Sequence, residues 1–234
     1  MGAAGSGTAA PYDAIADWYE QDFLQGAAPD AGIPGGDPIG IDAALQDLLG
    51  PGVGPCLEIG CGTGIHAERV RSLGWTPLGL DLSAGMLGHA RDRLAVARAD
   101  AGRLPVRDGA VAAVLTVMAH TDMPDYPQVL RDAARVLTPG GVLVHIGVHP
   151  CFCGGFADRT DPAAIVLRPG YRTDHWTTDS HTDRGLRDKV GAQHRPLAAL
   201  LNDVRAAGFV PERFAEGGAP TPTTFALRAR TSNG

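Results

Sequence analysis

The stretch Cys56-Leu57-Glu58-Ile59-Gly60-Cys61-Gly62-Thr63-Gly64 decides the fold of this chain. A short apolar run holding one carboxylate is followed by three alternate glycines, which predicts a buried strand, a tight turn and the start of a helix. Glycine lets the backbone present its N–H groups to a ligand with no Cβ in the way. A second carboxylate, Asp81, ends the next apolar run, where it can accept hydrogen bonds from ribose hydroxyls. The stretch therefore predicts a site for a ligand with a ribose and a polar tail.

Outward from this stretch, apolar runs alternate with segments of helical spacing. We expect strands at 56–59, 77–81, 96–99, 110–117 and 142–148, and helices at 65–73, 84–94 and 126–137. This alternation predicts an α/β fold with a mostly parallel sheet and helices on both faces. The last two strands, at 209–214 and 223–229, are expected to form an antiparallel pair at the sheet edge, after a helix at 195–207.

The remaining segments predict the domain organisation. Residues 1–10 are expected to be a disordered tail, and residues 11–234 a single domain, whose size is within the usual range. An N-terminal helical cap is expected at 11–49, with its first helix over 12–24. The segment 150–193 has few apolar residues and reads as an irregular lid or acceptor-binding insertion after strand five, since long irregular segments in compact domains are usually functional or disordered.

Composition favours a small substrate over a macromolecule. The chain has 20 Lys+Arg against 26 Asp+Glu, and its basic residues are scattered singly, so we expect no nucleic-acid partner. No apolar run approaches the ~20 residues needed to span a bilayer, and the start has no signal-peptide pattern. Four cysteines without a secreted-framework spacing favour the reducing cytoplasm. Nothing in the sequence indicates the oligomeric state.

The ordered motifs resemble those of class I S-adenosylmethionine-dependent methyltransferases. Residues 57–64 resemble motif I, 79–83 the ribose-binding strand end, 100–105 the D-x-x-x-L-P segment, 135–141 the R-V-L-x-P-G-G turn and 207–209 the entry to strand six. The resemblance implies a Rossmann-like, doubly wound, seven-stranded sheet that binds S-adenosyl-L-methionine and releases S-adenosyl-L-homocysteine. The cofactor-binding residues it implies are Tyr12, Tyr19, Glu58, Gly60, Cys61, Gly62, Gly64, Asp81, Leu82, Met86, Asp100, Ala101 and Val117.

The acceptor is expected over strands four and five, because ligands of open α/β sheets bind at the carboxyl ends of the strands. His120 and His149 follow those strands and are the candidate catalytic residues, since histidine titrates near neutral pH. His145, in mid-strand, is expected to be structural. The candidate substrate-binding residues in and after the insertion are His175, Trp176, His181 and His194. One histidine beside Cys151-Phe152-Cys153 does not complete a soft metal site, so no metal is expected.

These features together predict methyl transfer from S-adenosylmethionine to a small organic metabolite. O- or C-methylation is favoured because histidines stand where a base is wanted, and secondary metabolism is the favoured setting. Alternatives are N-methylation, a cyclase or isomerase that keeps the cofactor pocket, a binding protein with a vestigial pocket, and a nicotinamide oxidoreductase. The glycine spacing G-x-G-x-G argues against the last, whose fingerprint is G-x-G-x-x-G.

Overall fold

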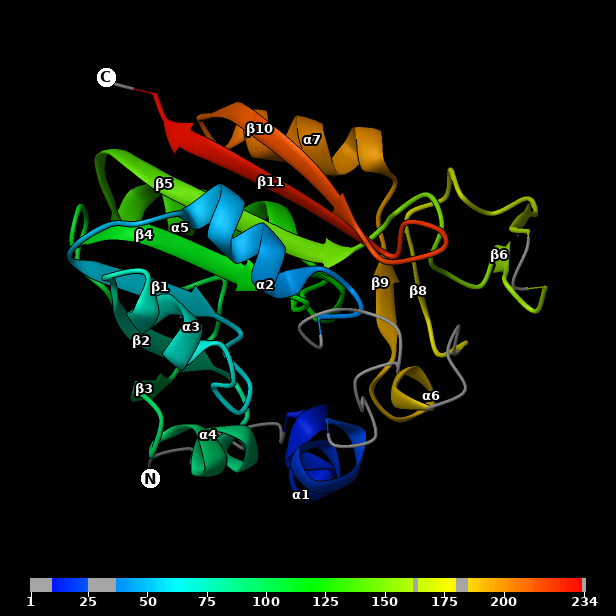
Figure 1. Cartoon of the computed structure of the whole chain (residues 1–234), viewed down its shortest axis with the longest axis horizontal. Coiled ribbons are helices and arrows are strands. Elements are labelled where there is room, and N and C mark those ends of the chain that lie inside the picture. The colour runs from blue at the N-terminus through cyan, green and yellow to red at the C-terminus, as the bar shows by residue number, and fades with distance from the viewer. Residues whose placement is uncertain (1–9, 25–36, 162–163, 180–184, 233–234) are drawn as a thin grey trace, which may run out of the picture.

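The computed structural model describes residues 10–24, 37–161, 164–179 and 185–232. Its central sheet contains β1 (Pro55–Ile59), β2 (Thr76–Asp81), β3 (Ala95–Arg98), β4 (Val111–Val117), β5 (Leu137–Val148), β10 (Phe209–Gly217) and β11 (Thr224–Thr231). The strand order is β10-β11-β5-β4-β1-β2-β3 (Figure 1). The five neighbouring strands β3, β2, β1, β4 and β5 pair in parallel, and β11 runs antiparallel to both β5 and β10. The predicted seven-stranded Rossmann-like sheet is thus confirmed, whereas most of the predicted tail, residues 1–9, lies outside the described residues.

Helices cover both faces of this sheet. They are α2 (Ile41–Ala44), continued by the π-helical η3 (Leu45–Leu49), then α3 (Ala67–Ser72), α4 (Ala84–Ala90), α5 (Tyr126–Val136) and α7 (Leu197–Ala206). One core holds Leu130 of α5 and Leu200 of α7, and the other holds Leu48 of η3 and Val70 of α3. β4 contributes neighbouring side chains to opposite cores because successive strand residues point to opposite faces. Its apolar run therefore corresponds to a strand buried on both sides.

Three elements differ most from the sequence prediction. The expected helix over 12–24 is divided into the 3₁₀ turn η1 (Pro11–Ala14), α1 (Ala16–Trp18) and the π-helical η2 (Tyr19–Phe23), since Ile15 leaves helical geometry at φ −126° and ψ 8°. α4 ends at Ala90, four residues early. β5 begins at Leu137, which pairs with Val111, so the proline–glycine turn is drawn into the strand.

The described parts of the insertion 150–193 contain more regular structure than its composition predicts. It contains β6 (Ala157–Asp158) paired with β7 (Val166–Leu167), β8 (His175–Thr177) paired with β9 (Ala192–His194), and α6 (Leu186–Val190). His194, predicted at the start of a helix, instead lies in β9 opposite His175. α6 contacts η1, and Figure 1 shows it beside α1. Within the described ranges, no helix is both long and apolar enough to cross a membrane.

Candidate active site

A cavity of about 1340 Å³ lies along the carboxyl ends of the central strands, between the sheet, the N-terminal segment and the insertion. The predicted cofactor residues that line it are Tyr12, Tyr19, Gly60, Cys61, Gly62, Asp81, Leu82, Met86, Asp100, Ala101 and Val117. Glu58 and Gly64 are not part of the lining. The structure thus gathers most of these residues, which come from segments up to about a hundred positions apart, around one space.

The turn after β1 requires glycine for two different reasons. Gly60 has φ +71°, and a Cβ there would lie 2.7 Å from Ala119 Cβ and 2.8 Å from Met123 Cε. Gly62 has φ +53° with open space around it, so backbone conformation alone selects glycine there. Because Gly60 has no Cβ, the chain after β4 can approach the turn closely. The glycine turn and the segment after β4 therefore lie side by side in the cavity wall.

Asp81 is held at the end of β2 by the backbone. Its two carboxylate oxygens accept hydrogen bonds from the N–H groups of Gly62 (2.9 Å) and Ser83 (2.8 Å). Burial raises the pKa of Asp81, and these N–H bonds oppose that rise. Each oxygen keeps acceptor capacity beyond its one backbone bond, because a carboxylate has about four lone-pair sites. The side chain can therefore accept further hydrogen bonds from a ligand in the cavity.

Glu58 holds a residue that the sequence analysis did not select. His66 Nδ1 lies 2.7 Å from Glu58 Oε1, and His66 lines the cavity. Burial lowers the pKa of His66, but the charge and hydrogen bond of Glu58 outweigh it, so the pKa lies above its ordinary value. The second oxygen, Glu58 Oε2, is buried without a hydrogen-bond partner in the described part of the chain. The sequence could have indicated His66, since a histidine two residues after the glycine turn stands at the start of the helix, next to the predicted ligand site.

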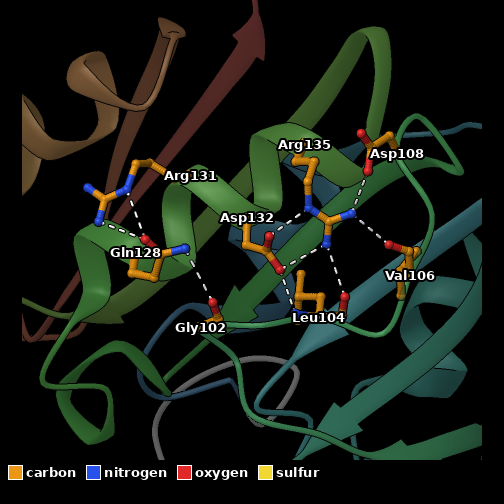
Figure 2. Close-up of polar contacts among 8 residues, drawn as sticks. All are labelled: Gly102, Leu104, Val106, Asp108, Gln128, Arg131, Asp132 and Arg135. Carbon is orange, nitrogen blue, oxygen red and sulfur yellow. Dashed lines mark hydrogen bonds and ion pairs between the residues drawn. The ribbon is translucent and has the colours of Figure 1, made fainter.

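The loop that carries Asp100 and Ala101 is fastened to α5 (Figure 2). Gln128 Nε2 donates to Gly102 O (3.3 Å), and Asp132 accepts from the N–H of Leu104. Arg135 donates to the Asp132 carboxylate (2.7 Å) and to two carbonyls of the loop, those of Leu104 and Val106. The loop position is thus set by two charged side chains one helical turn apart, as Figure 2 shows.

The N-terminal segment 10–23 is tied to the same side of the cavity through its carboxylates. Asp13 Oδ1 accepts from Ser83 Oγ (2.6 Å) and the Gly85 N–H (3.0 Å), and the Ser83 bond is the main reason that its pKa is lowered. Glu20 pairs with Arg93, which also donates to the Thr63 carbonyl in the glycine turn (2.7 Å). These contacts bring Tyr12 and Tyr19 to the cavity wall.

An ion pair lies in the cavity wall near the end of β4. Arg187 of α6 lies 2.7 Å from Asp122 of η4 (His120–Asp122), with 8% and 20% of the two side chains exposed, and both residues line the cavity. Burial raises the pKa of Asp122, and the Arg187 charge opposes that rise without cancelling it. Burial and the Asp122 charge likewise raise the pKa of Tyr12, whose side chain hydrogen-bonds to Asp122. The insertion is thereby joined to the sheet through a buried carboxylate that faces the cavity.

His120 points away from this space. Its ring lies 4.8 Å from the ring of His145 and 5.8 Å from that of Tyr126, and it is not part of the cavity lining. His145 Nδ1 hydrogen-bonds to the Tyr126 hydroxyl at 2.8 Å. Burial lowers the pKa of His145 to about 4 and that of His120 well below its ordinary value. His145 is thus buried as expected, and the catalytic role of His120 stays a prediction.

The ring of His149 makes hydrogen bonds in and beside the backbone turn that follows β5. Its Nδ1 accepts from the Cys151 N–H (3.1 Å) and its Nε2 lies 2.7 Å from Glu216 Oε1, so Nε2 carries the proton in this arrangement. His149 does not line the cavity, and its catalytic role also stays a prediction. The four cysteines are free, and the described residues contain no cluster of His, Cys, Asp and Glu suited to a metal ion.

Of the predicted substrate residues, the structure places only Trp176 in the lining. His194 hydrogen-bonds to the Tyr171 carbonyl (2.7 Å), and His175 to that of Thr173 (2.7 Å). His181 lies outside the described residues. The lining residues that the sequence analysis missed include His66, Asp122, Arg159 and Arg187. The last two lie in a segment without a recognisable pattern, and only the tertiary fold brings them to the strand ends.

Comparison with known proteins agrees with this geometry. Residues 57–145 match a family described as methyltransferase domain, the region that holds the glycine turn, Asp81 and Asp100. This region of the chain is therefore similar to a methyltransferase domain. The chain is 37% identical over 97 residues to the methyltransferase GfsG of Streptomyces halstedii, an alignment that covers 37% of this chain and 35% of that protein. The chain spans just over a third of the length of the curated relatives it matches.

Solved structures share the fold of this chain over most of its length. An S-adenosylmethionine-dependent methyltransferase from Mesorhizobium loti is 23% identical with a TM-score of 0.68, covering 80% of this chain and 96% of its own. The [4+2]-cyclase SpnF is 21% identical with a TM-score of 0.62, covering 82% of this chain and 80% of its own. S-adenosylmethionine is the cofactor that this fold and domain family imply. The residues around the glycine turn fit it, because Asp81 and the unpartnered Glu58 Oε2 are acceptors suited to a polar cofactor.

Proposed function

We propose that this protein transfers a methyl group from S-adenosylmethionine to a small organic acceptor. The observation that carries the proposal is the continuous cavity, which runs from the glycine turn and Asp81 to the ends of β4 and β5. Drug-sized ligands usually occupy pockets of about 300–1000 Å³. A cavity of about 1340 Å³ has room for a cofactor and an acceptor together.

The glycine-turn end of the cavity suits the cofactor. Asp81 would accept hydrogen bonds from the ribose hydroxyls, and Met86 and the Asp100 loop would border the adenine. His66 borders the space beside the turn, and Glu58, which lies behind this lining, holds the His66 ring through its Oε1. Tyr12 and Tyr19, held by the anchored N-terminal segment, would exclude water from the opposite side.

The other end of the cavity suits the acceptor. S-adenosylmethionine supplies an activated sulfonium methyl, so the protein contributes mainly the position of the attacking atom, which can account for several kcal/mol of the barrier. An acceptor that begins as O–H or acidic C–H must also lose a proton as the new bond to the methyl carbon forms. Asp122 lines this end of the cavity, and burial raises the pKa of its carboxylate. Asp122 is therefore better placed to take that proton than His120 or His149, which do not line the cavity.

Cofactor binding is tested with isothermal titration of S-adenosylhomocysteine into the wild type, Asp81→Ala and Asp92→Ala. Loss of hydrogen bonds to a charged group costs roughly 1.5–3 kcal/mol, so Asp81→Ala should weaken binding about 10- to 150-fold. Asp92, an exposed carboxylate after α4, is the matched control and should leave the affinity unchanged. Equal affinities in all three proteins would remove Asp81 from the ribose site.

Methyl transfer itself is tested by screening phenols, carboxylic acids, amines and acidic C–H compounds for S-adenosylhomocysteine release. Turnover in one class assigns the methylated atom and separates O- and C-methylation from N-methylation. A cofactor-retaining cyclase would instead convert its substrate while the S-adenosylmethionine remained intact. A protein that binds neither form of the cofactor would contradict the proposal altogether.

A further inference from the structure

We propose that the acceptor carries a carboxylate, and that Arg159 of the insertion binds it. This inference deepens the proposed function, on which it rests for the place of the acceptor. Arg159 follows β6 and lines the cavity with part of its side chain buried. Its neighbours in the lining are Cys153, after β5, and Thr223, before β11. The guanidinium therefore lies over the β5–β11 end of the sheet.

Neutral groups hold Arg159 in place without neutralising its charge. Nη1 donates to the Phe152 carbonyl (3.3 Å) and to Cys153 Sγ (3.5 Å), and Nη2 donates to Thr221 Oγ1 (3.1 Å). These partners come from two segments about 70 residues apart, which fixes the position of the guanidinium before any ligand binds. Within the described ranges, Arg159 has no ion pair with a carboxylate, and its Nε has no hydrogen bond in the structure.

Other arginines of this region are paired with acids. Arg187 pairs with Asp122, Arg168 with Asp158, and Arg195 with both Asp174 and Asp203. A partly buried charge without a counter-ion is costly, because the protein wall solvates it less well than water does. Among the arginines that the structure describes in the acceptor end of the lining, Arg159 is thus the one whose charge a ligand can still neutralise.

The cofactor is too far away to be the natural partner of Arg159. Asp81 ends β2 and Val148 ends β5, and the strand order places β2 and β5 three steps apart. At about 4.8 Å per step, the two strand ends are about 14 Å apart. A ligand with its ribose at Asp81 therefore fills the near end, and a second molecule reaches Arg159.

The surroundings favour a carboxylate over a phosphate. A guanidinium forms two parallel hydrogen bonds with a planar carboxylate, and one arginine matches one negative charge. The described lining contains no lysine, and its remaining acceptor-end cation, Arg187, is already paired. The lining of the same cavity also includes Val148, Val190 and Trp176, so an apolar or aromatic body should accompany the carboxylate.

The experiment compares a carboxylate and its neutral amide on the full chain. Fluorine-observed NMR titrations with 4-fluorobenzoate and 4-fluorobenzamide are run on the wild type, with and without saturating S-adenosylhomocysteine. Wild type should bind the benzoate about tenfold or more tightly than the amide, the lower range for charge-assisted hydrogen bonds. Equal binding of the two probes, or no binding of the benzoate, would overturn the proposal.

Variants then assign the preference to one residue. Arg159→Gln should reduce benzoate affinity about tenfold or more and leave amide binding unchanged. Arg159→Lys, which keeps the charge, should retain part of the benzoate affinity. Arg172→Gln, an exposed arginine of the same insertion outside the lining, should behave as the wild type.

A cofactor titration separates this proposal from the function on which it rests. Arg159→Gln should bind S-adenosylhomocysteine with wild-type affinity, and a comparable loss there would reassign Arg159 to the methionyl carboxylate of the cofactor. If the wild type failed to bind S-adenosylhomocysteine but kept an Arg159-dependent preference for benzoate, the anion site would stand and the methyltransferase proposal would not. Unchanged benzoate affinity in a folded Arg159→Gln protein would refute the anion site alone.

Discussion

Asp122 and His120 lie two residues apart in η4 but face different surroundings. Asp122 lines the cavity, whereas the His120 ring makes an edge-to-face contact with His145 inside the fold. Asp122→Asn should therefore lower turnover of an O–H acceptor about 10²-fold, a typical loss for a general base. His120→Gln should have a small effect on turnover. The measurement is kcat with the first acceptor identified, together with its pH profile.

The pH profile distinguishes a base from a structural ion pair. Turnover that depends on Asp122 should fall as pH drops through its raised pKa, and Asp122→Asn should remove that limb. A loss of turnover with an unchanged profile would indicate that the pair with Arg187 acts structurally. The reverse ranking, with His120→Gln the more damaging change, would restore the prediction made from the sequence.

His145 makes the stability of the protein sensitive to acid. Its pKa is lowered to about 4 in the folded protein, so between that value and ~6.5 the unfolded chain binds the proton and the folded one does not. Stability is therefore complete above about pH 6.5 and decreases as pH falls, by about 2 kcal/mol at pH 5 for this group. His145→Gln should reduce the difference in urea unfolding free energy between pH 7 and pH 5. An unchanged pH dependence would contradict this.

Residue by residue, the sequence predicted the cavity lining better at the glycine-turn end than at the ends of β4 and β5. The roles of the glycines and of Asp81 can be predicted from the sequence because they depend on backbone geometry. Gly60 and Gly62 have positive φ, and Asp81 accepts hydrogen bonds from backbone N–H groups. The direction in which His120 points is not local, because the ring packs on His145 and Gly147 of another strand. Spacing places a residue at a strand end without showing which way its side chain turns.

At the scale of elements, α5 positions the loop that bears Asp100 (Figure 2). Asp132→Asn removes the charge that pairs with Arg135 and accepts the Leu104 N–H. Unfolding free energy should fall by about 1–3 kcal/mol, the cost of leaving a buried partner unsatisfied. Asp108→Asn is the matched control, because this carboxylate pairs with the same arginine while 80% exposed and should matter by less than about 1 kcal/mol. Equal losses in the two variants, measured by urea denaturation, would contradict this account.

The elements with regular apolar spacing were predicted well, and those held by tertiary contacts were not. β4 and α5 follow their sequence patterns within a residue or two of their ends. The N-terminal segment passes through three helix types, and its position follows from the bonds of Asp13 to Ser83 and Gly85 and of Glu20 to Arg93. In the insertion, the Arg187–Asp122 ion pair holds the position of α6, and no local sequence pattern predicts this pair.

For the whole molecule, a ligand that fills the cavity should stabilise the fold. At a hundred times its Kd, S-adenosylhomocysteine adds about 2.7 kcal/mol, which for a chain of this size raises Tm by about 5–10 °C. Asp81→Ala should show a smaller shift at the same concentration. Differential scanning fluorimetry checks both, and a shift identical in the two proteins would place the ligand elsewhere.

The anchoring of residues 10–23 has a consequence for the kinetics of exchange. Because Asp17 and Glu20 join this segment to His89 and Arg93, a nucleoside held beneath it leaves only when those bonds open. Release of product, and not the chemical step, would then set the maximal rate, as it does in many enzymes with mobile covers. Removing both bonds with Asp17→Ala and Glu20→Ala should therefore shorten the residence time of S-adenosylhomocysteine, measured by stopped-flow displacement. An unchanged residence time would contradict this role of the segment.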